Sequence, residues 1–181
     1  MRVRNTHEHY GLVTKLLHWV TALLIIGLIA LGWWMVDLSY FDRYYQSSLS
    51  AHRALGMLVF VLGILTLVWR GLSPSPQAVA SLKPWERVLG HAMHHLLFFM
   101  VLAIPLSGYL ISTSAGQAID VFGWFEIPAV VKVGSGLRDI AIDIHFYLAY
   151  ATAILVCMHA GAALKHQLID RDGTLARMIW K

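Results

Sequence analysis

Residues 16 to 36 read "LLHWVTALLIIGLIALGWWMV", a run of 21 side chains that contains no Lys, Arg, Asp or Glu. A helix needs about 20 mostly apolar residues to cross the hydrocarbon core of a bilayer, so this run predicts a membrane span. Three other stretches are also mostly apolar and approach this length, at 54–70, 96–113 and 140–164. The sequence therefore predicts an all-α integral membrane protein, with residues 1–181 forming one four-helix bundle.

The overall composition supports this prediction. Hydrophobic residues make up 58% of the chain and charged residues 13%, against about 25% charged residues in ordinary soluble domains. We expect lipid around the spans and no nucleic acid among the partners. The long segment 114–139 is too apolar to extend freely into water, so we expect it either on the membrane surface or folded over the mouth of the bundle.

Lys and Arg are unevenly divided between the two sets of segments that connect the spans. Ten lie in the N-terminal segment, between the second and third spans, or in the C-terminal tail: Arg2, Arg4, Lys15, Arg70, Lys83, Arg87, Lys165, Arg171, Arg177 and Lys181. The other two segments hold Arg43, Arg53, Lys132 and Arg138. Because loops rich in Lys and Arg stay in the cytoplasm, both termini are predicted there, in a bacterial inner membrane.

Histidine is the most informative residue type, with ten in the chain. Ionisable side chains are costly in a span and usually face the bundle interior, where they serve a function. His145 and His159 are 14 residues apart on the fourth span, so they share one helix face and lie about 21 Å apart along its axis. This separation is too long for one metal ion and suits two cofactors.

The direction of each span supplies a partner for each of these histidines. His18 opens the first span on the cytoplasmic side, at the depth of His159. His52 precedes the second span on the periplasmic side, at the depth of His145. Paired neutral imidazoles in an apolar bundle are typical axial ligands of b-type haem. Residues with small side chains follow each histidine by four positions and leave room beside it: Ala22, Gly56, Ala149 and Ala163.

Four segments carry a resemblance to a known family: "YGLVTKLLHW", "HRALGMLVFVLGILTLVWR", "LGHAMHHLLFFMVLAIPLSGYL" and "IHFYLAYATAILVCMHAGAALKH". On the basis of these segments, nearly the whole chain resembles the bacterial cytochrome b561 family. Members of that family are four-helix inner-membrane proteins with two non-covalently bound b haems. The resemblance implies that His18 and His159 bind the cytoplasmic-side haem iron, and that His52 and His145 bind the periplasmic-side one. These are the pairs that depth alone predicts.

Other side chains near the predicted haems have alternative interpretations. Arg53 and Arg138 lie at the periplasmic edge, where guanidinium groups suit haem propionates or an anion and equally suit lipid headgroups. His94 and His166 lie on the cytoplasmic side. Both are candidates to contact a quinone. The alternative for His94 is anchoring at the membrane interface, and the alternatives for His166 are a haem propionate or phospholipid.

Two haems at opposite depths predict a protein that moves electrons across the membrane. The resemblance implies ubiquinone as the acceptor and superoxide as the donor, which is a superoxide:quinone oxidoreductase, or superoxide oxidase. The alternative is a haem-bearing relay subunit that catalyses nothing alone and receives electrons from a separate periplasmic redox protein. The periplasmic segments hold more acidic than basic side chains, so only a local patch at Arg53 and Arg138 would attract an anion.

Overall fold

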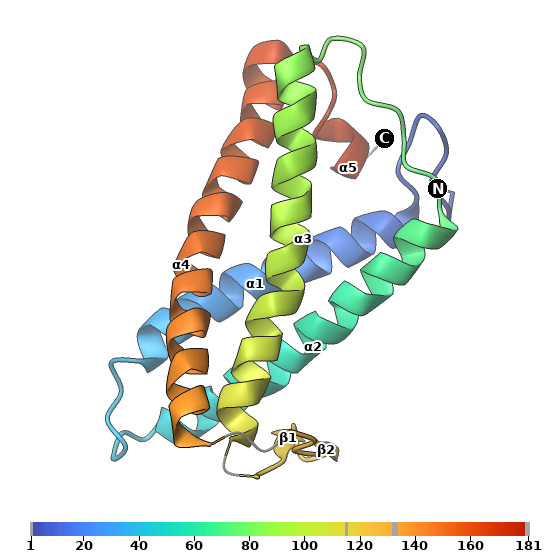
Figure 1. The fold of residues 1–181 in the computed structure, drawn as a ribbon. Helices are drawn as coiled ribbons and strands as arrows, with labels where there is room; N and C mark the ends of the chain where they lie inside the picture. Colours follow the sequence, from blue (N-terminus) through green and yellow to red (C-terminus); the bar gives the residue numbers. More distant parts are fainter. Residues whose placement is uncertain (1, 115, 132–133, 180–181) are drawn as a thin grey trace.

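The computed structural model describes residues 2–114, 116–131 and 134–179. Four long helices run through these described residues and can be followed in Figure 1. In order the elements are α1 (Leu12–Met35), α2 (Tyr45–Leu72), α3 (Pro84–Thr113), β1 (Ile119–Val121), β2 (Phe125–Ile127), α4 (Ser135–Lys165), the π-helical turn η1 (His166–Asp170) and α5 (Ala176–Ile179). All four long helices are apolar and long enough to cross a membrane, as the sequence predicts.

Three of these helices begin well before the predicted apolar runs. α2 begins at Tyr45 rather than at residue 54, and α3 begins at Pro84 rather than at residue 96. α4 begins five residues before the predicted residue 140. Hydropathy marks only the part of a helix that lies in hydrocarbon, whereas backbone hydrogen bonds carry the helix on through polar residues at the membrane surface. His52, which precedes the predicted second span, therefore lies well inside α2.

The helices pack in chain order, with α1 against α2, α2 against α3 and α3 against α4. The α1–α2 pair and the α3–α4 pair meet at one end of the bundle and diverge toward the other (Figure 1). Small residues allow the close approach of α2 to α3. A Cβ on Gly63 would lie 2.8 Å from Val101 Cγ1 and 2.9 Å from Leu102 Cδ2, so any side chain there would have to displace these α3 side chains.

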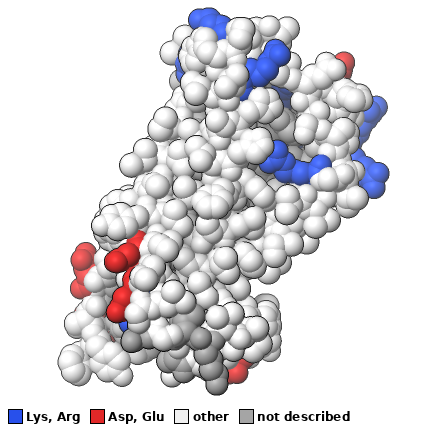
Figure 2. Space-filling view, viewed as in Figure 1, with Lys and Arg blue, Asp and Glu red and all other residues white. Residues whose placement is uncertain are grey.

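The outward faces of the helices are apolar. Leu23 is 67% exposed and Ile154 is 62% exposed, and many other large hydrophobic side chains face outward in the same way. Most of the Lys and Arg visible in Figure 2 lie toward one end of the molecule, and most of the Asp and Glu lie toward the other. An apolar belt between charged ends is the surface that a bilayer requires.

The segment that follows α3 closes one end of the bundle with a small β-hairpin. β1 and β2 pair antiparallel, with Val121 opposite Phe125, and the β1 side chains Ile119 and Val121 are buried. The hydroxyl of Tyr109 on α3 donates to the Pro128 carbonyl. β1 packs against α2 and α3, so this segment folds over the bundle. We call this the hairpin end.

The opposite end carries both chain termini and is called the terminal end (Figure 1). Here the residues after η1 turn back, and α5 lies between the diverging helix pairs (Figure 1). The indole N–H of Trp19 donates to the Met178 carbonyl over 2.9 Å. The Arg177 guanidinium donates to the carbonyls of Glu8 and Gln77. These bonds fasten the C-terminal segment to α1 and to the loops beside it.

Candidate haem-binding sites

His52 on α2 and His145 on α4 face each other near the hairpin end. Their ring centroids are 6.1 Å apart and their planes are inclined by 67°. The two residues are 93 positions apart in the chain, so only the packing of the helices brings them together. This is one of the two pairs that the sequence predicts.

The orientation of His145 is fixed by α3. Its Nδ1 lies 3.1 Å from the Ile104 carbonyl oxygen and 3.0 Å from the Ser107 hydroxyl. A carbonyl oxygen only accepts hydrogen bonds, so Nδ1 carries the proton and donates it. The lone pair then lies on Nε2, as a metal-binding imidazole requires, and the partner on Nδ1 sets the ring orientation and the basicity of the ligand.

Two glycines give the rings of this pair their space. A Cβ on Gly108 would lie 3.2 Å from His145 Cε1, and a Cβ on Gly32 would lie 3.4 Å from His52 Cε1. Each imidazole therefore rests close to the backbone of a neighbouring helix, α3 for His145 and α1 for His52. The absence of a Cβ at Gly32 and Gly108 therefore helps to set the distance between the two rings.

His18 on α1 and His159 on α4 form the second pair, at the terminal end. Their ring centroids are 6.2 Å apart and their planes are inclined by 65°. A third imidazole joins them, because the His94 ring on α3 lies 5.2 Å from that of His159. The sequence predicts His94 on this side of the membrane but not its contact with His159.

The distances in the two pairs suit two ligands of one iron. Metal–imidazole bonds are about 2.0 Å long, so two rings that bind one iron from opposite faces have centroids about 6 Å apart. Both His18–His159 and His52–His145 have this spacing. The contact between His94 and His159, at 5.2 Å, is too short for an iron between the rings.

The surroundings of the hairpin-end pair also fit a haem. Buried Nδ1 of His52 has no hydrogen-bond partner among the described residues. A Cβ on Gly56, one turn beyond His52, would meet nothing within 4 Å, so this turn of α2 has open space beside it. Imidazoles from two facing helices are the donor set of b-type haem.

Comparison with known proteins agrees with this geometry. The model of the family described as prokaryotic cytochrome b561 matches residues 9–181. The chain belongs to the prokaryotic cytochrome b561 family. Its relatives include cytochrome b561 homolog 2 of Escherichia coli (strain K12), which is 41% identical over 181 residues, covering 100% of this chain and 96% of the relative.

Two more distant relatives also match over most of their length. Cytochrome b561 homolog 1 of Escherichia coli (strain K12) is 29% identical, over 90% of this chain and 92% of its own. A protein of Yersinia pestis named probable superoxide oxidase CybB is 28% identical, over 97% of this chain and 98% of its own. Membership of the family makes this chain a multi-pass protein of the bacterial inner membrane that binds haem b and transports electrons.

The two arginines that the sequence singles out lie at the hairpin end of the bundle. Arg53 is the residue after His52 on α2 and is half-buried. Arg138 is exposed at the start of α4, with its Nη1 3.8 Å from a carboxylate oxygen of Asp139. The neighbouring carboxylate offsets part of the Arg138 charge. Lys132, the other basic residue predicted on this side besides Arg43, lies outside the described residues.

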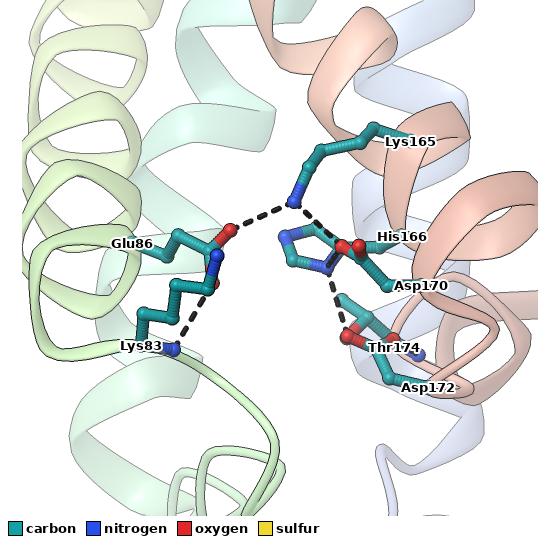
Figure 3. A network of polar contacts seen from close by, with 7 residues as sticks. All are labelled: Lys83, Glu86, Lys165, His166, Asp170, Asp172 and Thr174. Atoms are coloured by element: carbon teal, nitrogen blue, oxygen red, sulfur yellow. Dashed lines mark hydrogen bonds and ion pairs between the residues drawn. The ribbon is translucent and has the colours of Figure 1, made fainter.

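His166 lies within a cluster of charged side chains at the terminal end (Figure 3). Its Nδ1 is 2.8 Å from Asp172 Oδ2 and 3.0 Å from Asp170 Oδ2. Lys165 joins the cluster to α3, because its Nζ lies 2.7 Å from Glu86 Oε1 and 2.7 Å from Asp170 Oδ2. The sequence offers His166 as a contact of a quinone, a haem propionate or phospholipid, and gives no indication of these partners.

The backbone after α4 explains how Asp172 reaches His166. η1 ends at Asp170, and the next residue, Arg171, adopts the left-handed conformation with φ of 52°. Gly173 follows with φ of 81°. Together these residues reverse the chain within one turn. The Asp172 carboxylate accepts the Thr174 backbone N–H over 2.9 Å and faces back toward the ring. π-helical turns of this kind are frequent at functional sites.

Sequence reasoning does not identify the residues that hold the histidines. Ser107 and Gly108 belong to "PLSGYL", and small or polar residues in a membrane helix are a general signal of close helix contacts. By sequence Lys15 is simply a basic residue near a span end, yet it is 4% exposed. Hydropathy gives no information on which way such side chains point.

Proposed function

We propose that this protein is a di-haem b oxidoreductase, which passes electrons from a donor at the hairpin end to ubiquinone at the terminal end. The observation that carries the proposal is the presence of two imidazole pairs, His52–His145 and His18–His159, with centroid distances of 6.1 and 6.2 Å. The pairs lie about 21 Å apart along α4, from the spacing of its two histidines.

The assignment of sides rests on charge. Most of the basic side chains visible in Figure 2 lie at the terminal end, and most of the acidic ones lie at the hairpin end. Because positively charged loops remain in the cytoplasm, the terminal end is assigned to the cytoplasm and the hairpin end to the periplasm. Both termini are then cytoplasmic.

The residues of the chain have separate roles in this function. A bis-imidazole haem b accepts and releases one electron at a time. The four histidines hold the two irons, and the bond from His145 Nδ1 to α3 orients one ring. Arg53 and Arg138, at the hairpin end, are the proposed contacts of a haem propionate or an anionic donor. His94 and His166 are the proposed quinone contacts at the terminal end.

Haem content tests this assignment. We expect two haems per chain by pyridine haemochrome, both extracted by acidified organic solvent. His18→Ala or His159→Ala should remove one haem, and His52→Ala or His145→Ala the other. Replacement of His95, whose Nδ1 bonds its own helix at the His91 carbonyl, is the control and should leave both. One haem or none in the parent protein would refute the two-site proposal.

Superoxide is the proposed donor. The name of the Yersinia pestis relative, probable superoxide oxidase, supports this choice. If Arg53 and Arg138 steer the anion, Arg53→Gln or Arg138→Gln should slow haem reduction by superoxide in stopped-flow mixing, and more at low salt than at high salt. Exposed Arg2 at the opposite end provides the control, Arg2→Gln, which should have no effect.

The charge of the hairpin end favours a second candidate, the relay subunit. Six acidic residues belong to the segments assigned to the periplasm, against the four basic ones named above: Asp37, Asp42, Asp120, Glu126, Asp139 and Asp143. An acidic face suits a basic protein partner better than it suits an anion. Slow, salt-independent reduction by superoxide, together with fast reduction by a co-purifying periplasmic protein, would favour the relay.

A further inference from the structure

The turn of the β-hairpin presents three exposed aromatic side chains. Trp124 is 84% exposed, and Phe122 and Phe125 beside it are exposed as well. Residues 122–125 read "FGWF" and contain no charged side chain. We call these four residues the hairpin tip. The four proposed haem ligands lie on α1, α2 and α4, so the haem sites do not account for the aromatic rings of the tip.

The backbone of the tip has a conformation that phenylalanine rarely adopts. Phe122 has φ of 55° and Gly123 has φ of 73°. Gly, Asn and Asp usually occupy this left-handed region, whereas a bulky side chain there is an outlier. The Trp124 N–H donates to the Val121 carbonyl over 3.0 Å, and the Asp120 carboxylate accepts the Gly123 N–H. An aromatic ring held in a strained turn and left exposed points to a contact outside the chain.

The hairpin has one apolar face and one acidic face. Val121 lies opposite Phe125, and residues directly opposite share a face. Ile119, two residues before Val121, is on the same face, and both are buried where β1 packs against α2 and α3. Asp120 and Glu126 lie opposite each other on the other face and are exposed. An apolar side toward the bundle and an acidic side toward water suit a segment that lies in a membrane interface.

The lipid-facing surface of the helices continues onto this segment at Tyr109. A groove between α2 and α3 is lined by apolar and aromatic side chains, which belong to Met57, Phe60, Pro105, Leu106 and Tyr109. The Tyr109 hydroxyl donates to the Pro128 carbonyl over 2.7 Å and accepts the Val130 N–H over 2.8 Å. Val130 is itself exposed. The apolar surface that meets the bilayer on α2 and α3 therefore extends up to the segment that carries the hairpin.

The loop between α1 and α2 presents aromatic side chains at the same end, on the opposite flank of the bundle (Figure 1). Phe41 is 93% exposed, and the Tyr40 ring lies edge-on to it with centroids 5.8 Å apart. The Arg43 guanidinium lies over the Tyr44 ring, 5.5 Å from its centroid. Aromatic rings beside an arginine are typical of the level of the lipid headgroups. Two separate segments thus indicate that the membrane interface lies at this level of the hairpin end.

We propose that the hairpin tip inserts into the bilayer interface at the hairpin end, with Phe122, Trp124 and Phe125 among the headgroups and upper acyl chains. The partner is the lipid surface, where aromatic side chains concentrate. The hairpin is then held on the bilayer by its tip and on the bundle by Ile119 and Val121, which keeps it closed over α2 and α3. This contact is independent of the electron donor and acceptor.

A fluorescent label at the tip measures its depth. Trp124→Cys in a Cys157→Ser background has a single thiol, because Cys157 is the one cysteine of the chain, and takes an NBD dye. The full-length, haem-loaded protein is placed in nanodiscs of phosphatidylethanolamine and phosphatidylglycerol that contain a nitroxide lipid. An interfacial anchor lies about 5–10 Å into the boundary of headgroups and acyl chains. The dye should therefore lose most of its emission to a nitroxide near the headgroup, less to one near the chain end, and little to aqueous iodide.

Two other single-thiol proteins are the controls. Glu126→Cys in the same background places the dye two residues away, on the acidic face, and should lose its emission to iodide and not to the nitroxide lipids. Cys157 itself, exposed on α4 within the fourth span, should give the reverse result. Each intensity is compared with that of the same protein without quencher, so that quenching by haem cancels.

The strain at Phe122 provides a second test, in which two explanations predict opposite signs. Asn adopts the left-handed conformation more readily than Phe, so the change Phe122→Asn should tighten the hairpin if only contacts within the chain matter. If the ring is an anchor, its loss should free the hairpin from the bilayer. In nanodiscs we expect severalfold faster amide hydrogen exchange in residues 119–127 of Phe122→Asn than of the parent. Glu126→Gln, on the acidic face, is the control and should exchange no faster than the parent.

The outcomes are distinct. Slower exchange in Phe122→Asn than in the parent would overturn the proposal, and this comparison decides the matter if Trp124→Cys fails to fold. A label at residue 124 that iodide quenches as fully as the label at residue 126 would also overturn it, and would leave the tip as a surface for a protein partner. Neither result would affect the proposed electron transfer, because haem content and haem reduction are measured separately.

Discussion

Gly108 is the position at which a single methyl group tests the proposed haem site most directly. In Gly108→Ala the new Cβ would lie 3.2 Å from His145 Cε1 and 3.4 Å from its Nδ1. Favourable contacts of this kind begin at about 3.5 Å, so the ring has to move away from α3 by about 0.3 Å. The Ile104 carbonyl and the Ser107 hydroxyl, which hold Nδ1 at 3.1 and 3.0 Å, are on α3 as well.

The same movement therefore lengthens both hydrogen bonds beyond about 3.2 Å, the upper end of the normal range for N–H···O. Loss of one net hydrogen bond costs about 1 kcal/mol, which corresponds to about fivefold weaker haem binding. The assay is haem loss to excess apomyoglobin in a His159→Ala background, which by the proposal holds only the hairpin-end haem. Gly108→Ala should lose this haem about five times faster than its parent.

Gly32→Ala is the matched control. Its Cβ would lie 3.4 Å from His52 Cε1 and 3.9 Å from His52 Nδ1, which is close to ordinary contact, so haem loss should change less than about twofold. Equal rates of haem loss in the parent and in Gly108→Ala, or faster loss in Gly32→Ala than in Gly108→Ala, would refute the role assigned to the α3 contacts.

Two other predictions concern stability. Gly63→Ala places a Cβ 2.8 Å from Val101 Cγ1 and 2.9 Å from Leu102 Cδ2, and should lower the free energy of unfolding by about 1–3 kcal/mol, measured by circular dichroism during denaturation in detergent. Gly27→Ala, whose Cβ meets nothing within 4 Å, should show no loss. Burial acts to raise the pKa of Asp172, but the hydrogen bonds from the Thr174 N–H and the His166 ring outweigh it and hold the pKa below its ordinary 3.8. The Asp172 carboxylate therefore stabilises the folded C-terminal segment above pH 3.8, and this stability is lost as pH falls through the lower folded-state pKa. Hydrogen–deuterium exchange in residues 172–179 should rise in this window, and a flat response in the parent protein, or the same rise in Asp172→Asn, would contradict the assignment.

The four spans are predictable from the sequence because hydropathy is a local property. A run such as 16–36 has to avoid water whatever its neighbours are. The alternating direction of the spans then predicts which histidines share a depth, so the sequence alone matches His18 with His159 and His52 with His145. The ends of the helices are less predictable, because α2 and α3 extend through polar residues that hydropathy assigns to loops.

The contacts that tune the histidines are decided only by the tertiary structure. Ser107 and Ile104 meet His145 because α3 and α4 pack with one particular rotation about their axes. Glu86 reaches Lys165 from 79 residues away, and Asp172 reaches His166 because the chain reverses at Arg171. The apolar pattern of a helix predicts which side faces inward, but only as a broad stripe of its surface. Hydrogen bonds need their atoms placed within a few tenths of an ångström, and this placement comes from the packing of the whole bundle.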